Sequence, residues 1–271
     1  MRSGSLGSRK SLDINSAFLQ IDPDVRMSLQ DAAETLRKAQ SVVVFTGAGI
    51  SAESGIPTYR TGTDGLWSAA NMQKYANPRG YRANLPDSYE WYRKRADGVA
   101  AAEPNAGHRA IAALAERVAA LTLVTQNIDS LHHRAGSRDV IELHGNLRDV
   151  RCDDCGARIM WNAAPAQPEC AVCGGMLRPD VVMFEEMLPV GAMERAEAAA
   201  ASADVLISVG TSNQVWPAAE LPLIARRSGA AVVIINPDLE GQPWGHRVSY
   251  LRGPAGEILP ALVAAAWPSS P

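Results

Sequence analysis

The sequence predicts an α/β fold in which a doubly wound, mostly parallel sheet carries a smaller inserted domain. Three observations lead to this expectation. Apolar runs rich in β-branched residues alternate with segments of helical periodicity, a pattern typical of parallel strands joined by helices. A glycine-rich turn, Gly47-x-Gly49-x-x-Ala52, follows the first of these runs. All four cysteines lie between residues 152 and 173, so one short segment has a chemistry of its own.

The first predicted helix spans Ser28 to Lys38. Its apolar residues follow the i, i+3, i+4, i+7 spacing of an amphipathic helix, and Ser28 is a suitable N-cap. Residues 1–28 are rich in Ser, Gly and Arg and lack the apolar core of a secretory signal, so we expect a disordered tail. A cloning remnant and an organellar targeting segment are the two interpretations of that tail.

The run Val42–Phe45, closed by Thr46, predicts a buried strand. The turn after it fits the dinucleotide-binding fingerprint G-x-G-x-x-G/A, which makes the expected sheet Rossmann-like. In such a turn the first glycine reverses the chain, the second lets the backbone approach a pyrophosphate, and the small third residue lets helix pack on strand. The acidic residue that usually follows a second strand has no counterpart, because residues 68–78 show no strand pattern. The sequence therefore does not indicate an ordinary dehydrogenase.

Residues 61–104 are rich in Gly, Asn, Pro and aromatic side chains. A helical insertion over the ligand cleft fits this composition, and so does an irregular surface segment. Pro104–His108 then opens an Ala-rich helix that we expect to continue to about Ala120. Four further apolar runs predict strands that end in polar or small residues, at the edge where open α/β sheets bind ligands: 121–125, 140–146, 205–212 and 231–237.

The cysteines form two C-x-x-C pairs, Cys152 with Cys155 and Cys170 with Cys173. This spacing is typical of a zinc ribbon, in which four thiolates hold one zinc ion tetrahedrally. No coordination position would stay open for water, so the metal would be structural. Disulfides are disfavoured by the reducing compartment that we expect, iron is chemically possible, and a redox C-x-x-C would account for only one pair.

Several longer stretches resemble the sirtuins, the NAD-dependent protein deacylases. Residues 47–60, GAGISAESGIPTYR, are similar to the sirtuin signature loop. Residues 125–129 and 144–146 match the sirtuin motifs T-Q-N-I-D and H-G-N letter for letter. The ends of the two later strands and residues 251–256 also resemble sirtuin cofactor motifs, so the resemblance covers about residues 29–265.

The resemblance implies a Rossmann-like part of about residues 29–60, 105–148 and 178–271. It also implies a small domain made of a helical insertion at 61–104 and a zinc ribbon at 149–177. NAD would be the cofactor, and nicotinamide would leave when the carbonyl oxygen of an acyl-lysine attacks C1′ of its ribose. The implied cofactor-binding residues are Gly47, Ala48, Gly49, Ala52, Glu53, Tyr59, Arg60, Gln126, Asn127, Ile128, Asp129, Gly210, Thr211, Ser212, Asn236 and Ala255.

The resemblance also implies sharper roles for His144 and for several of the cofactor-binding residues. His144 would be the general base that deprotonates a ribose hydroxyl, a role that suits the ordinary histidine pKa of about 6.5. Asn127 and Asp129 would hold the nicotinamide ribose and carboxamide, while Arg60 and the glycine turn would meet the phosphates. The other histidines, among them His108 and His132, are interpreted as structural or surface residues.

The resemblance also places the substrate. Val182, Phe184 and Glu185 fall on the segment that binds the substrate peptide as an added strand in sirtuins. Sirtuins usually have Gly at the position of Glu185, and we expect the carboxylate to favour peptides with Lys or Arg near the acyl-lysine. Two smaller departures lie in the cofactor loop: Tyr59 replaces the common Phe, and residues 61–67 are one residue longer than usual.

Tyr92 and Arg95 match the Y-x-x-R pair of sirtuins that prefer succinyl- and malonyl-lysine. A phenol and a guanidinium three residues apart share a helix face and together can bind a carboxylate. Ala76 resembles the small residue that makes room for the longer acyl chain. The alternative is that Arg95 belongs to a solvated basic face and Tyr92 to the core.

The predicted function is NAD-dependent deacylation of acyl-lysine proteins, as a deacetylase, desuccinylase or demalonylase. A net charge of −3 gives no electrostatic reason to expect nucleic acid, and no apolar run approaches the roughly 20 residues of a membrane span. We therefore expect no nucleic-acid or membrane partner and a cytoplasmic location. An NAD-dependent protein ADP-ribosyltransferase is one alternative. A non-catalytic, zinc-stabilised nucleotide-binding module is another, although such a module needs no base near the ribose.

Overall fold

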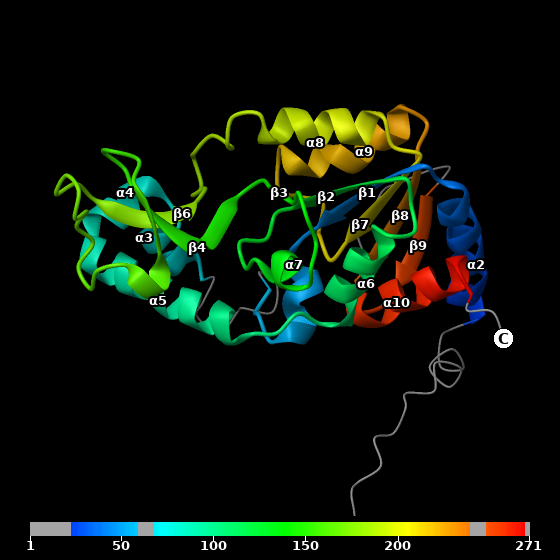
Figure 1. Ribbon diagram of the computed structural model, residues 1–271, viewed down its shortest axis with the longest axis horizontal. Coiled ribbons are helices and arrows are strands. Elements are labelled where there is room, and N and C mark those ends of the chain that lie inside the picture. Colours follow the sequence, from blue (N-terminus) through cyan, green and yellow to red (C-terminus); the bar gives the residue numbers. More distant parts are fainter. Residues whose placement is uncertain (1–22, 59–67, 239–247, 269–271) are drawn as a thin grey trace, which may run out of the picture.

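A computed structural model describes residues 23–58, 68–238 and 248–268, with the side chains of 23–28 and of residue 69 left aside. Its larger sheet has six parallel strands in the order β3-β2-β1-β7-β8-β9 (Figure 1). The predicted doubly wound parallel sheet is thereby confirmed. The strands are β1 (Ser41–Thr46), β2 (Ala120–Thr125), β3 (Ile141–Glu142), β7 (Val205–Val209), β8 (Ala231–Asn236) and β9 (Val248–Arg252).

Helices cover both faces of this sheet. Alternate side chains of a strand point to opposite faces, so Val42 and Val44 pack into one apolar core while Val43 and Phe45 pack into another. The first core is formed with α2 (Pro23–Lys38), α6 (Ala106–Leu114) and α10 (Ala255–Ala266). The second is formed with α8 (Ala192–Ala201) and α9 (Leu221–Arg227), which lie along the upper side of the sheet in Figure 1. Burial on both faces explains why the strands read as continuous apolar runs.

The central strands end in register. Thr46 lies opposite Thr125 on one side and Val209 on the other, so the loops after β1, β2 and β7 leave from the same edge. Strands β1 and β7 are neighbours at the centre of the sheet. From β1 successive strands are added outward on one side (β2, β3), and from β7 they are added outward on the other side (β8, β9), so the strand order reverses between β1 and β7. Such a switch point is where open α/β sheets bind their ligands.

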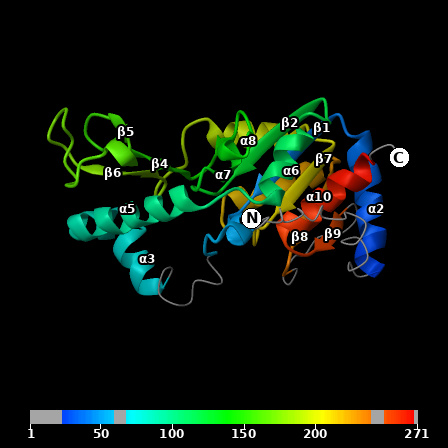
Figure 2. The same ribbon diagram turned by 60° about the horizontal axis from the view of Figure 1, so that its bottom comes forward.

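A smaller module extends from one end of this sheet (Figures 1 and 2). It contains an antiparallel sheet in the order β5-β4-β6 and three helices packed around a largely aromatic core that includes Tyr81, Tyr89, Tyr92 and Trp161. Of the two interpretations of residues 61–104, the described part forms helices. The elements are α3 (Ala69–Tyr75), α4 (Pro78–Ala83), α5 (Leu85–Ala101), β4 (Gly145–Cys152), β5 (Arg158–Met160) and β6 (Leu177–Val181).

Several boundaries differ from the sequence expectations. The first helix begins at Pro23, so the predicted N-cap Ser28 lies inside it. Helix α6 ends at Leu114 and not near Ala120, because the chain turns there to enter β2. Strands β4, β5, β6 and β9 were not predicted, since polar or charged residues interrupt their apolar residues. The predicted tail lies outside the described residues up to position 22, and no described helix has the length and apolar character to span a bilayer.

The four cysteines come together at one end of the small sheet. Their Sγ atoms all lie within 4.8 Å of one another, with Cys152 and Cys173 3.6 Å apart and Cys155 and Cys170 3.7 Å apart. Tetrahedral zinc with Zn–S bonds of about 2.3 Å places its sulfurs about 3.8 Å apart, so the donor set fits one zinc ion. A disulfide requires about 2.05 Å between the sulfurs, which none of these pairs approaches. This cluster is the structural zinc site that the spacing predicted.

We expect about one zinc ion per chain, because four convergent thiolates bind the metal and fold together. Cys152→Ala should lose the metal and lower the melting temperature by roughly 5 °C or more, since about 1 kcal/mol moves the melting temperature of a chain this size by about 2–4 °C. Elemental analysis and thermal melts measure both effects. The control is Val172→Ala, a 74% exposed side chain between two of the ligands, which should leave both unchanged. Metal-free protein that is folded and active when freshly purified would contradict the prediction.

Candidate active site

The turn after β1 is held against the loop after β7 by backbone alone. The Gly49 N–H donates to the Gly210 carbonyl over 2.8 Å, and a Cβ added to Gly49 would lie 2.6 Å from the Gly210 Cα. A Cβ on Gly47 would lie 2.8 Å from the Thr211 Cβ. Gly210 itself has φ +60°, a backbone conformation that glycine adopts without strain. The glycines are therefore required by the packing of these two loops, whatever ligand approaches them.

The helix that the glycine turn opens is η1 (Ala48–Ser54), a short 3₁₀ helix that Gly55 ends in the left-handed conformation. Its Ser51 is fully buried and donates to the Asp129 carboxylate over 2.6 Å. The Asn127 side-chain amide donates to the Gly47 carbonyl over 3.1 Å and to the Ser51 hydroxyl over 3.3 Å. Two predicted cofactor residues from the loop after β2 are thereby joined to the loop after β1.

Two buried histidines lie behind this group. His108 Nδ1 accepts from the Asn105 N–H over 3.3 Å, so the proton of the neutral ring is on Nε2, which faces the Ser51 hydroxyl at 3.4 Å. His132 Nε2 lies 2.9 Å from the Thr46 hydroxyl, and the two imidazole rings are 4.9 Å apart. Burial lowers the pKa of His108 to about 4 and that of His132 to about 3, so both rings are neutral at physiological pH.

Asp129 shares this environment. Burial raises the pKa of its carboxyl, and the hydrogen bonds from Ser51 and from the Leu131 N–H oppose that rise. Ser51 was not among the predicted site residues, and His108 was interpreted as structural or surface. The available signal was the start of α6: Asn105 is its N-cap, and Asn105 and His108 bond reciprocally in a capping box that points the imidazole inward.

His144 follows β3 at the same edge of the sheet. Its Nδ1 lies 3.0 Å from the Gln126 carbonyl, which can only accept, so Nδ1 carries the proton and Nε2 keeps its lone pair. Burial lowers the pKa of this imidazole and the bond to Gln126 raises it by less, so the ring stays neutral to a lower pH than a free histidine. The side chain can therefore accept a proton at Nε2 near neutral pH.

The other predicted cofactor residues are spread along this edge. The Gln126 and Asn236 amides both donate to Thr211 over 3.0 Å, which links the loops after β2, β7 and β8. The Glu53 carboxylate accepts from the Gly256 N–H over 2.6 Å and so occupies the N-terminus of α10, next to Ala255. Within the same loops lie Ala48, Ala52, Ile128 and Ser212. Tyr59, Arg60 and the longer 61–67 loop lie outside the described residues.

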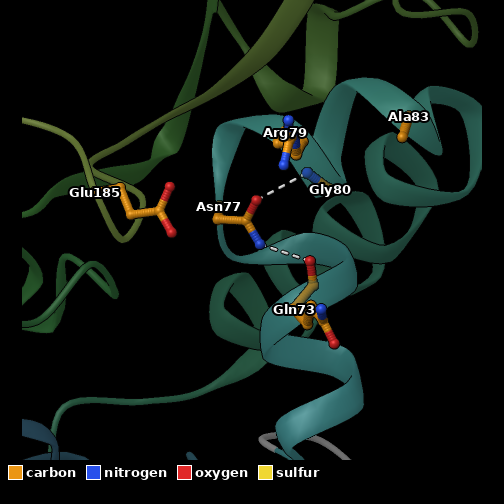
Figure 3. A pocket seen from close by; sticks show the side chains of 6 residues that line it. All are labelled: Gln73, Asn77, Arg79, Gly80, Ala83 and Glu185. Atoms are coloured by element: carbon orange, nitrogen blue, oxygen red, sulfur yellow. Dashed lines mark hydrogen bonds between the residues drawn. The ribbon is translucent and has the colours of Figure 1, made fainter.

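The segment predicted to bind peptide connects both parts of the molecule. The Val182 N–H donates to the His144 carbonyl and the Phe184 N–H to the Ala76 carbonyl, each over 2.9 Å. Glu185 follows with φ +73° and lines a surface pocket with residues of α3 and α4 (Figure 3). In Figure 3 its carboxylate points toward Asn77, between α3 and α4. The other lining residues are Gln73, Asn77, Arg79, Gly80 and Ala83.

The predicted acyl-recognition residues lie on α5 facing α3. Tyr92 is buried, with its hydroxyl 3.4 Å from the Tyr75 carbonyl, directly before Ala76. The Arg95 guanidinium lies 3.3 Å from the centre of the Trp91 ring, which stacks on Tyr75 at 4.8 Å. The structure therefore brings Tyr92, Arg95 and the end of α3 into one aromatic group.

The chain was compared with known proteins. A family model described as the Sir2 family matches residues 47–217, more than half of the chain. An NAD-dependent protein deacylase of Methylococcus capsulatus is 45% identical over 247 residues, which are 88% of this chain and 96% of that protein. A Sir2 homologue crystallised with NAD has a TM-score of 0.81 at 43% identity and covers 88% of this chain and 93% of its own. A Sir2 protein bound to a myristoylated histone peptide has a TM-score of 0.72 at 34% identity, over 89% of this chain and 97% of its own. The chain belongs to the Sir2, or sirtuin, family.

Proposed function

We propose that this chain is an NAD-dependent protein lysine deacylase, which transfers the acyl group of an acyl-lysine to ADP-ribose and releases nicotinamide. The observation that carries the proposal is His144, a neutral imidazole with a lone pair on Nε2 at the sheet edge that also holds Asn127 and Asp129. A nucleotide-binding module has no use for such a base. The activity of the Methylococcus relative and the acylated peptide on a Sir2 neighbour support the same substrate class.

The residues at the switch point fit NAD. The neutral amides of Gln126 and Asn127 lie at the edge between β1, β2 and β7, and the glycines leave no side chain between the loops. The Ser130 hydroxyl is buried and has no hydrogen-bond partner among the described residues, so it can serve a polar ligand. When bound, NAD supplies the electrophilic ribose carbon and the nicotinamide leaving group.

The chain's own residues then have distinct roles. Asn127 and Asp129 bind the nicotinamide half, and Ser51 fixes the Asp129 carboxylate. His144 takes a proton from a ribose hydroxyl at Nε2, while the Nδ1–H bond to the Gln126 carbonyl holds the ring and stabilises its charged form. The expected cytoplasmic location and the absence of nucleic-acid or membrane partners stay predictions of the composition.

His144→Ala should lower deacylation at least ~10²-fold, the usual contribution of a general base. NAD affinity should change only a few-fold, because the imidazole acts after the cofactor is bound. The measurements are acyl-peptide turnover and calorimetric NAD binding.

His133→Ala is the control, since this half-buried histidine on α7 (Leu131–Arg134) pairs with Glu142 of β3 at 3.0 Å and should matter little. Turnover by His144→Ala within a few-fold of wild type would refute the assignment, and transfer of ADP-ribose to protein without deacylation would indicate the alternative transferase activity.

The finer proposal is that succinyl- and malonyl-lysine are the preferred substrates. Tyr92 and Arg95 would bind the distal carboxylate, with the guanidinium offering two parallel N–H donors. Tyr92 reaches the end of α3 through the Tyr75 carbonyl, and Arg95 packs on Trp91, whose ring stacks on Tyr75. The Ala76 side chain beside Tyr75 is small and buried.

Arg95→Met should therefore lose about 1.5–3 kcal/mol of transition-state binding toward succinyl-lysine, the range for a hydrogen bond to a charged group. Deacetylation should hardly change, and kcat/KM for both acyl-peptides is the measurement. Arg93→Met is the matched control on the same helix, because Arg93 instead lies over the Tyr89 and Trp161 rings. Equal losses toward both acyl groups would show that Arg95 supports the fold and does not bind the acyl carboxylate.

Glu185 should select peptides by charge. Glu185→Gln keeps the side chain's size and backbone conformation, so only the charge is removed from the pocket. We expect the preference for Lys or Arg near the acyl-lysine to shrink by about 2–5-fold, as for an exposed ion pair. Competition between basic and acidic acyl-peptides measures it. An unchanged peptide profile would mean that the carboxylate does not meet the substrate.

A further inference from the structure

Among the described residues, the largest side chain that is almost fully buried belongs to Arg178, at 2% exposure. It lies in β6, one residue from Leu177, which pairs with the zinc ligand Cys152 across the small sheet. Its two terminal nitrogens donate to both carboxylate oxygens of Glu186, over 2.5 and 2.7 Å, and one also donates to the Val181 carbonyl over 3.0 Å. A two-armed pair of this kind, here with a buried guanidinium and a half-buried carboxylate, has strong geometric specificity.

Glu186 has a second task. Its Oε2 accepts from the Met183 N–H over 2.8 Å, and its own N–H donates to the Met183 carbonyl over 3.1 Å. These bonds close a β-turn over residues 183–186. The turn overlaps the Val182–Phe184 segment, which bonds to the His144 and Ala76 carbonyls. Although burial raises the pKa of Glu186, the bonds from Arg178 and Met183 lower it by more, so the carboxylate is charged at neutral pH.

The third residue of this turn is Glu185, with φ +73°, while Phe184 before it has no positive φ. This combination is that of a type II turn, whose third position favours Gly because a Cβ is disfavoured there. The chain therefore has an unfavourable residue at the tip of the turn, and beside it a charge pair of which the Arg178 side is buried. The pair is placed to compensate for the strain.

We propose that Arg178 and Glu186 are positioning residues. They hold the 183–186 turn in the conformation in which the Glu185 backbone is left-handed, and so keep the Val182–Phe184 segment in its peptide-binding position. This inference rests on the proposed function, because it assumes that the segment binds an acyl-peptide. The pair touches neither cofactor nor acyl group and acts through the backbone of the segment.

The test is a double-mutant cycle on the full-length, zinc-loaded protein. Glu186→Gln keeps the shape of the side chain but leaves the buried Arg178 charge with only the more distant Asp153 carboxylate, 3.9 Å away, so KM for a succinyl-lysine peptide should rise roughly 10-fold or more. KM for NAD and the zinc content should stay within about 2-fold, since neither site contacts Glu186. Arg178→Lys, which keeps the charge but loses the fork, should give the same pattern more weakly.

Combining Glu186→Gln with Glu185→Gly is the deciding arm. Glycine removes the strain of the left-handed position, so the double variant should recover most of the lost peptide affinity and melt at a higher temperature than Glu186→Gln alone. Combining Glu186→Gln with Glu185→Gln keeps the backbone strain, so neither the peptide affinity nor the melting temperature should recover. This comparison separates the effect of the backbone from the effect of the charge.

The control pair is Arg158 with Asp180, joined over 2.8 Å on the same sheet with an exposed guanidinium. Arg158→Gln should leave peptide KM unchanged, because exposed ion pairs contribute little. If Glu186→Gln cost the same peptide affinity with and without the Glu185→Gly substitution, the inference would be overturned, as it would be by parallel increases in KM for peptide and NAD. If the wild-type protein bound no acyl-peptide at all, the proposed function would fail, whereas the melting temperatures of the same variants would still test the turn.

Discussion

The site depends on the direct backbone contact between Gly49 and Gly210, at the point where strand order reverses between β1 and β7. No Cβ fits at this contact, so the two loops close directly on each other. The Gly47 carbonyl then receives the Asn127 amide, and Ser51 is brought over Asp129. A larger residue at either glycine would separate the loops and with them the groups contributed by β1, β2 and β7.

Burial sets the protonation of the site. His108 and His132 are neutral because a charged imidazole would lose its hydration in this interior, and their ring nitrogens are used to orient hydroxyl groups. His144 differs because its Nδ1–H bonds to the Gln126 carbonyl and its Nε2 keeps a lone pair that can accept a proton. The same histidine chemistry thus fixes positions in the interior and provides a base at the edge.

The small module is joined to this site by contiguous contacts. The zinc ligand Cys152 lies opposite Leu177 in the small sheet, Arg178 follows and pairs with Glu186, and the segment before Glu186 bonds to the His144 carbonyl. A metal held by the cysteines therefore stabilises more than the two C-x-x-C turns. The same small sheet also contains Arg178, which pairs with Glu186 next to the peptide-binding segment. Since Ala76 accepts from Phe184, the same segment also fixes the end of α3.

The sequence by itself determined five of the six parallel strands, the glycine turn and the zinc ligands, because each is a local pattern with a local physical cause. It also indicated His144, Asn127 and Asp129 through motif resemblance. It did not reveal Ser51 and His108 as partners of Asp129, because these residues become neighbours only when α6 packs over η1. Nor did it predict strands β4 to β6, because their apolar residues follow no regular alternation and pair and pack only within the tertiary structure of the small module. Likewise, Arg178 and Glu186 are ordinary charged residues in the chain, and only the tertiary structure, which buries Arg178 and brings the half-buried Glu186 against it, makes them a directional pair.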